Sequence, residues 1–61
     1  MPVITLEAAK LTKEQKQQLT KEFTESAARI TGSPESVFYV FIKENDLDNV
    51  GVGGQLLSDK N

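Results

Sequence analysis

Residues 2–7 alternate between two faces of an extended segment. Pro2, Ile4 and Leu6 fall on one face and make it wholly apolar, whereas the other face mixes apolar and polar side chains. A period of two predicts a β-strand close to the beginning of the chain.

The period becomes helical after residue 12. Thr12 is a suitable N-cap, and Gln15 completes a capping box. Apolar residues then recur along one stripe: Leu19, Phe23, Ala27 and Ile30. Gly32 suits a left-handed C-terminal cap, and Pro34 lies just beyond it. These signals predict a helix over residues 13–31.

Residues 36–44 contain an apolar run from Val37 to Ile42. Such a run indicates a strand that is covered on both faces, and one helix can cover only one of them. We therefore expect another subunit on the second face. Strand, helix and strand predict an α/β (α+β) fold: a single βαβ unit with parallel strands.

The last segment, residues 50–57, is rich in glycine: Gly51, Gly53 and Gly54. A phosphate-binding loop is one interpretation, but no G-x-G-x-x-G is present and no long helix follows. The segment instead predicts a short C-terminal β-hairpin.

The length and composition of the chain favour self-association. We expect residues 1–61 to form a single domain, and chains below about 70–80 residues rarely bury enough apolar surface to be stable alone. The chain has no cysteine and no histidine, so disulfides and zinc sites built on these residues are excluded. Assembly into an oligomer is the remaining means of stabilisation.

The charge and hydropathy of the chain restrict the classes of partner that we expect it to bind. The net charge of −2 and the lack of a basic stripe argue against nucleic-acid binding. No apolar run approaches the roughly 20 residues that span a bilayer, and no signal peptide is present. We expect a cytoplasmic protein that does not bind membranes.

Pro2 is the one residue with candidate chemistry at its backbone nitrogen. If Met1 is removed, this nitrogen becomes a secondary amine, and an α-amino group has a reference pKa of about 8. The rigid ring then positions a base that can work near neutral pH. The alternative is that Pro2 is only a common second residue, tolerated at the start of a strand.

In their order and spacing, these segments resemble the 4-oxalocrotonate tautomerase family, the small subunits of the tautomerase superfamily. The resemblance covers nearly the whole chain. It rests on Met1-Pro2 before a strand, Thr12-Lys13-Glu14-Gln15-Lys16 at the helix start, Gly32-Ser33-Pro34 at its end, Val40-Phe41-Ile42-Lys43-Glu44 in the second strand and Gly51-Val52-Gly53-Gly54 near the end.

Members of this family are typically hexamers, built as trimers of βαβ dimers, and use an amino-terminal proline as a catalytic base. The resemblance therefore implies that Pro2 is the base of a cofactor-independent keto–enol tautomerase. It further implies a homohexamer and a small anionic enol or oxo-acid substrate similar to 2-hydroxymuconate.

The chain departs from the best-known members at three positions. Where they carry an arginine before the helix, this chain has Lys10-Leu11; where they carry one in the second strand, it has Tyr39; and Val50 replaces a phenylalanine before the glycines. The resemblance thus makes Lys10, Tyr39 and Val50 candidate substrate-binding residues. Lysine offers a point charge instead of a two-pronged grip, and tyrosine offers one neutral donor.

Each of these candidates has a simpler interpretation. Tyr39 can be a strand aromatic with a hydrated hydroxyl, Lys10 a solvated loop lysine and Val50 part of the hairpin core. The protein as a whole also has rivals: a hydratase or dehalogenase that uses the same proline, or a non-catalytic oligomeric assembly module.

Overall fold

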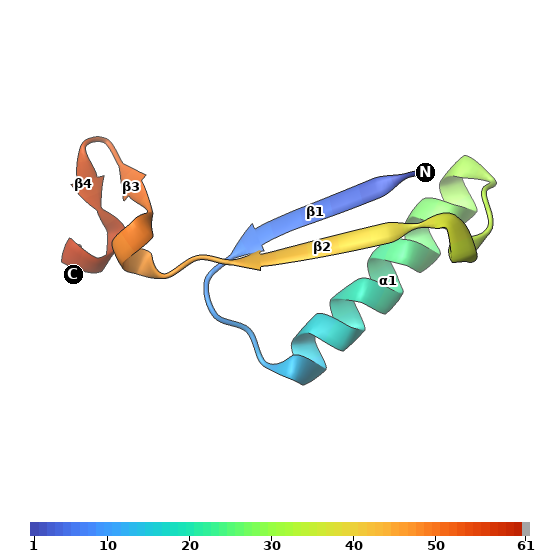
Figure 1. Cartoon of the computed structure of the whole chain (residues 1–61), viewed down its shortest axis with the longest axis horizontal. Helices are drawn as coiled ribbons and strands as arrows, with labels where there is room; N and C mark the ends of the chain where they lie inside the picture. The colour runs from blue at the N-terminus through green and yellow to red at the C-terminus, as the bar shows by residue number, and fades with distance from the viewer. Residues whose placement is uncertain (61) are drawn as a thin grey trace.

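The computed structural model describes residues 1–60 and contains one βαβ unit followed by a small hairpin (Figure 1). Its elements are β1 (Val3–Ala8), α1 (Lys13–Thr31), β2 (Tyr39–Glu44), β3 (Gly51–Val52) and β4 (Gln55–Leu56), with short 3₁₀ turns at Glu35–Val37, Leu47–Asn49 and Leu57–Asp59. The predicted fold class is confirmed.

β1 and β2 pair in parallel, with Val3 opposite Tyr39 and Ala8 opposite Glu44. The helix runs back across one face of this two-stranded sheet (Figure 1). Side chains on alternate positions are half-buried on that side: Pro2, Ile4 and Leu6 from the first segment, and Val40 and Ile42 from β2.

The opposite face of the sheet is not covered by any of the described residues. Val3 is 48%, Tyr39 51% and Phe41 49% exposed, and these three residues alternate with the half-buried ones. The expectation that one helix leaves the apolar second strand open on one side is therefore confirmed for the single chain.

The second strand starts later than predicted. Its first residue is Tyr39, whereas the apolar pattern placed the strand from residue 36. Residues Glu35–Val37 form a 3₁₀ turn after Pro34, with the Phe38 N–H donating to the Glu35 carbonyl. Proline sets up this turn because its fixed φ suits a turn entry.

The helix begins and ends as its caps predict. The Thr12 hydroxyl accepts from the Gln15 N–H at 3.1 Å, and the Gln15 side chain accepts from the Thr12 N–H at 2.9 Å. Gly32 closes the helix at a φ of 76°. Ile30, the last residue of the predicted apolar stripe, lies in the last turn of α1 and is 74% exposed in the single chain.

The hairpin turn depends on two glycines. Gly53 and Gly54 have φ values of 62° and 84°, and both lie between β3 and β4. Successive left-handed residues define the two-residue turn whose twist matches paired strands, and glycine adopts it without strain.

The chain is more open than a self-sufficient domain of its size. No described residue is fully buried, and the radius of gyration is 14.8 Å. A compact 61-residue domain has a radius of gyration of about 10.5 Å. The accessible surface is 4819 Å², roughly 900 Å² above the value expected for a compact protein of this mass.

Removal of the N-cap hydroxyl should weaken the fold measurably. We expect Thr12→Ala to lower the free energy of unfolding by about 1 kcal/mol, because the Gln15 N–H loses its acceptor. Urea unfolding at one fixed protein concentration provides the measurement. Thr20→Ala, at an exposed position inside α1, is the matched control and should cause no loss; equal losses in both variants would contradict the capping role.

Candidate functional site

Pro2 and Tyr39 lie together at one end of the sheet. The Tyr39 N–H donates to the Pro2 carbonyl at 3.0 Å, so the parallel pairing extends one step beyond β1. Pro2 is half-buried on the helix side, and Tyr39 exposes its side chain on the open face. The Pro2 nitrogen is joined to the exposed Met1 and is an amide as long as Met1 is retained.

Lys10 and Val50 lie at the other end of the sheet. Lys10 is exposed in the segment between β1 and α1. Val50 is half-buried at the base of the hairpin, where its carbonyl accepts from the Leu57 N–H at 2.8 Å.

A cavity of about 510 Å³ opens beside Val50. Its lining combines the exit of β1 with the base of the hairpin: Glu7, Ala8, Ala9, Asn45, Leu47, Asn49, Val50, Gly51 and Leu57. The Asn45 amide donates to the Glu7 carboxylate at 3.2 Å and so joins the two sides of this cavity. A mixed apolar and polar lining of this kind suits a small organic molecule.

A single chain does not bring its four candidate residues together. β1 has six residues and therefore spans roughly 20 Å between the Pro2 end and the Lys10 end. No side chain bridges that distance, so Lys10 and Val50 cannot serve the Pro2 of their own chain.

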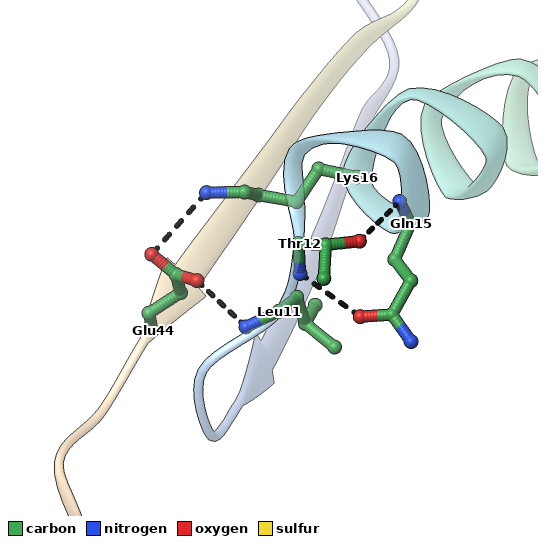
Figure 2. Close-up of polar contacts among 5 residues, drawn as sticks. All are labelled: Leu11, Thr12, Gln15, Lys16 and Glu44. Atoms are coloured by element: carbon green, nitrogen blue, oxygen red, sulfur yellow. Dashed lines mark hydrogen bonds and ion pairs between the residues drawn. The ribbon is translucent and has the colours of Figure 1, made fainter.

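Glu44, at the end of β2, holds the segment that carries Lys10 (Figure 2). One carboxylate oxygen accepts from the Leu11 N–H at 2.8 Å, and the other lies 3.3 Å from the Lys16 ammonium of α1. The Leu11 side chain is half-buried, which fixes the peptide group next to Lys10 from a second direction.

These contacts also stabilise the charged form of Glu44. The hydrogen bond from Leu11, followed by that from Lys16, holds the pKa of the Glu44 carboxyl below its ordinary value of 4.5, and the charge of Lys10 adds to this effect. The direction is that expected when donors and cations surround a carboxylate.

The sequence alone did not indicate that Glu44, Glu7 and Asn45 contribute to these contacts. The Glu44–Leu11 bond joins positions 33 residues apart, and the Asn45–Glu7 bond joins positions 38 apart. Only the pairing of β1 with β2 brings them together, so no local motif could have indicated them.

The described residues contain no group of three or more histidine, cysteine or acidic side chains arranged for a metal ion. In the same part of the chain, the one long helix lacks the apolar length needed to cross a membrane.

The sequence and the βαβ fold of this chain match those of known proteins. Residues 2–60 match the model of the Tautomerase family, described as tautomerase enzymes. The YwhB homologue of 4-oxalocrotonate tautomerase is 36% identical with a TM-score of 0.92, covering 98% of this chain and 100% of its own. DmpI from Archaeoglobus fulgidus is also 36% identical, with a TM-score of 0.87 and coverages of 95% and 100%.

A third structure, the 4-oxalocrotonate tautomerase homologue TTHB242, is 32% identical with a TM-score of 0.89, covering 100% of this chain and 98% of its own. No match was found among curated protein sequences. The family match extends over nearly the whole chain, and the protein therefore belongs to the tautomerase family.

The charge of Glu44 should make the stability depend on pH. The folded state lowers the pKa of Glu44 below its ordinary value of 4.5. The carboxylate therefore stabilises the native state fully at pH values above 4.5, and this stabilisation is lost as the pH falls through the lower pKa of the folded state. Thermal unfolding of wild type and Glu44→Gln should therefore differ most near neutral pH and converge in acid.

The Lys16→Met background supplies the control for this measurement. Lys16→Met removes the ion pair of Glu44 but keeps its hydrogen bond with Leu11. In this background, the pH-dependent difference in thermal stability between the proteins with and without Glu44→Gln should therefore be smaller than in wild type, but still present. A difference between wild type and Glu44→Gln that stays constant from neutral to acidic pH would contradict the assignment.

Proposed function

We propose that the protein is a cofactor-independent keto–enol tautomerase in which Pro2, exposed by removal of Met1, is the general base. The observation that carries this proposal is the position of Pro2: the family match begins there, and the residue is half-buried at the end of a paired strand. The hydrogen bond from Tyr39 and the half-buried position of Pro2 hold this strand end in place, as a positioned base requires.

The reaction is a proton transfer on an enol acid of the 2-hydroxymuconate class. The neutral amine of Pro2 takes the proton of the enol hydroxyl, the O–H electron pair forms the carbonyl C=O bond, and the electrons of the enol C=C bond shift along the conjugated system to a carbon atom. The protonated Pro2 amine returns the proton to that carbon, which forms the new C–H bond and leaves the amine neutral. The product is the conjugated oxo acid. A donor that faces the developing oxyanion lowers the barrier, and Tyr39 is the candidate for this role. Lys10 is the candidate cation for a substrate carboxylate.

We further propose that a second copy of the chain completes the site. The two ends of one sheet are too far apart to share a substrate, while the open face of Val3, Tyr39 and Phe41 is available for association. The excess surface of roughly 900 Å² is close to what one partner buries in a standard interface, about 800 Å². Assembly, as a homohexamer, would place Lys10 and Val50 of one copy at Pro2 of another.

Processing of the amino terminus should decide activity. Met1-free protein should convert 2-hydroxymuconate at a rate that rises with pH through the pKa of the Pro2 amine, since only the neutral form accepts a proton. Met1-bearing protein should be inactive because its Pro2 nitrogen is an amide. Turnover is compared by absorbance, after the mass of each form is confirmed.

Pro2→Ala is the matched variant, because it keeps a primary amine after processing and should retain part of the activity. Equal turnover with and without Met1 would remove Pro2 from the mechanism. Release of halide, or hydration of an unsaturated acid, without ketonisation of the enol would favour the hydratase or dehalogenase interpretation. Absence of turnover in all forms would favour the assembly module.

Self-association should depend on the open face of the sheet. Phe41→Glu puts a charge at a half-exposed apolar position of that face, so it should shift the sedimenting species towards smaller assemblies and lower the unfolding midpoint. Thr20→Glu adds the same charge at an exposed position of α1 and should leave both unchanged. A wild-type protein that is a stable monomer at low micromolar concentration would contradict the proposed assembly.

A further inference from the structure

We infer that Glu44 is a positioning residue: its carboxylate holds the Lys10–Leu11 peptide group against the end of β2 and so fixes where the Lys10 ammonium meets a substrate carboxylate. This inference rests on the proposed function, in which Lys10 binds the anionic group. Glu44 itself contacts no substrate in this arrangement.

The first support is the anchoring of the segment on both sides of Lys10. On one side, the Ala8 carbonyl accepts from the Asn45 N–H at 2.8 Å, which extends the strand pairing. On the other side, the Leu11 N–H donates to Glu44 at 2.8 Å (Figure 2). Lys10 lies between the two anchors, so its backbone is held although its side chain is exposed.

The second support is the link from Glu44 to the start of the helix. Lys16 of α1 lies 3.3 Å from the carboxylate, and the Thr12–Gln15 capping box fixes the intervening backbone. One carboxylate at the end of β2 therefore holds both the Lys10 segment and the first turns of α1, which are adjacent to each other in the sequence and distant from β2 (Figure 2).

The third support is the distribution of charge. Lys10 is close enough to Glu44 to influence it, but Lys16 makes the direct ion pair. Lys16 thus offsets part of the charge of Glu44 and leaves the Lys10 ammonium available to an external anion. Without Lys16, Glu44 would compete with the substrate for Lys10.

Charge and position can be separated with two substitutions of Glu44. Glu44→Gln keeps an oxygen that accepts from Leu11 and removes the negative charge, whereas Glu44→Ala removes both. The probe is adipate, an unreactive six-carbon dicarboxylate, with its Kd measured by calorimetry on the Met1-free protein. Parallel kinetics with 2-hydroxymuconate give KM and kcat.

Glu44→Ala should raise the Kd of adipate about fivefold, because the loss of one hydrogen bond releases the Lys10 segment. Glu44→Gln should bind adipate as tightly as wild type or about twofold more tightly, since the repelling charge is gone. That gain should vanish in about 0.5 M salt, while the loss in Glu44→Ala should persist. With 2-hydroxymuconate, Glu44→Ala should raise KM more than it lowers kcat.

A double-mutant cycle distinguishes positioning from general stabilisation. If Glu44 acts through Lys10, Glu44→Ala should cause no further loss in a Lys10→Ala background. Lys16→Met, which keeps the Leu11 bond, should weaken adipate binding because Glu44 is then free to pair with Lys10. The Lys16→Met variant also tests the inference in the case that the Glu44→Ala protein does not fold. Glu25→Gln, at an exposed position of α1, is the charge control and should leave the Kd unchanged.

The inference is overturned if Glu44→Ala and Glu44→Gln change the Kd alike, if their losses add to that of Lys10→Ala, or if the wild-type protein does not bind adipate. Failure of the proposed function is a different result. A protein that binds adipate with the expected pattern but does not convert 2-hydroxymuconate would retain the role of Glu44 and lose the tautomerase assignment.

Discussion

The two-stranded parallel sheet, covered on one face only, is the constraint on which the rest of the structure depends. Parallel strands need a long crossover, and α1 supplies it while it covers Ile4, Leu6, Val40 and Ile42. One helix has no second face to offer, so the remaining apolar side chains of the sheet stay in water. A chain this small cannot cover them with its own residues, and the hairpin lies beyond the sheet's end instead of over it (Figure 1).

This geometry also separates the chemistry along the sheet. A candidate base at the start of β1 and a candidate cation after its end lie roughly 20 Å apart. The separation is a direct result of parallel pairing, in which β1 runs its full length before the chain turns into α1. Association with a second copy would therefore serve both stability and the proposed site. A partner that covers the open face of the sheet can also bring its own Lys10 end close to the Pro2 end of the first copy.

Local features were predictable from the sequence, and distant contacts were not. The capping box at Thr12 and the left-handed Gly32 use residues a few positions apart, so their signals are complete in the sequence. The late start of β2 was missed because an apolar run does not show which of its residues enter a 3₁₀ turn. Pro2 was recognisable as a candidate from its place in the chain, whereas the contacts of Glu44 form only after the strands pair.

In the proposed site, Lys10 stands where relatives are expected to carry an arginine, and this difference is the reason that the Glu44 contact matters to the proposal. A guanidinium binds a carboxylate through two parallel hydrogen bonds, so its own planar shape sets the orientation of the pair. An ammonium on a flexible four-carbon stem carries no such information, and a site built on Lys10 must obtain it from the backbone. The backbone beside Lys10 is held by a carboxylate that is also paired with Lys16. If Lys10 binds the substrate as proposed, the orientation that a guanidinium would set by its own shape is set here by the segment that presents the lysine.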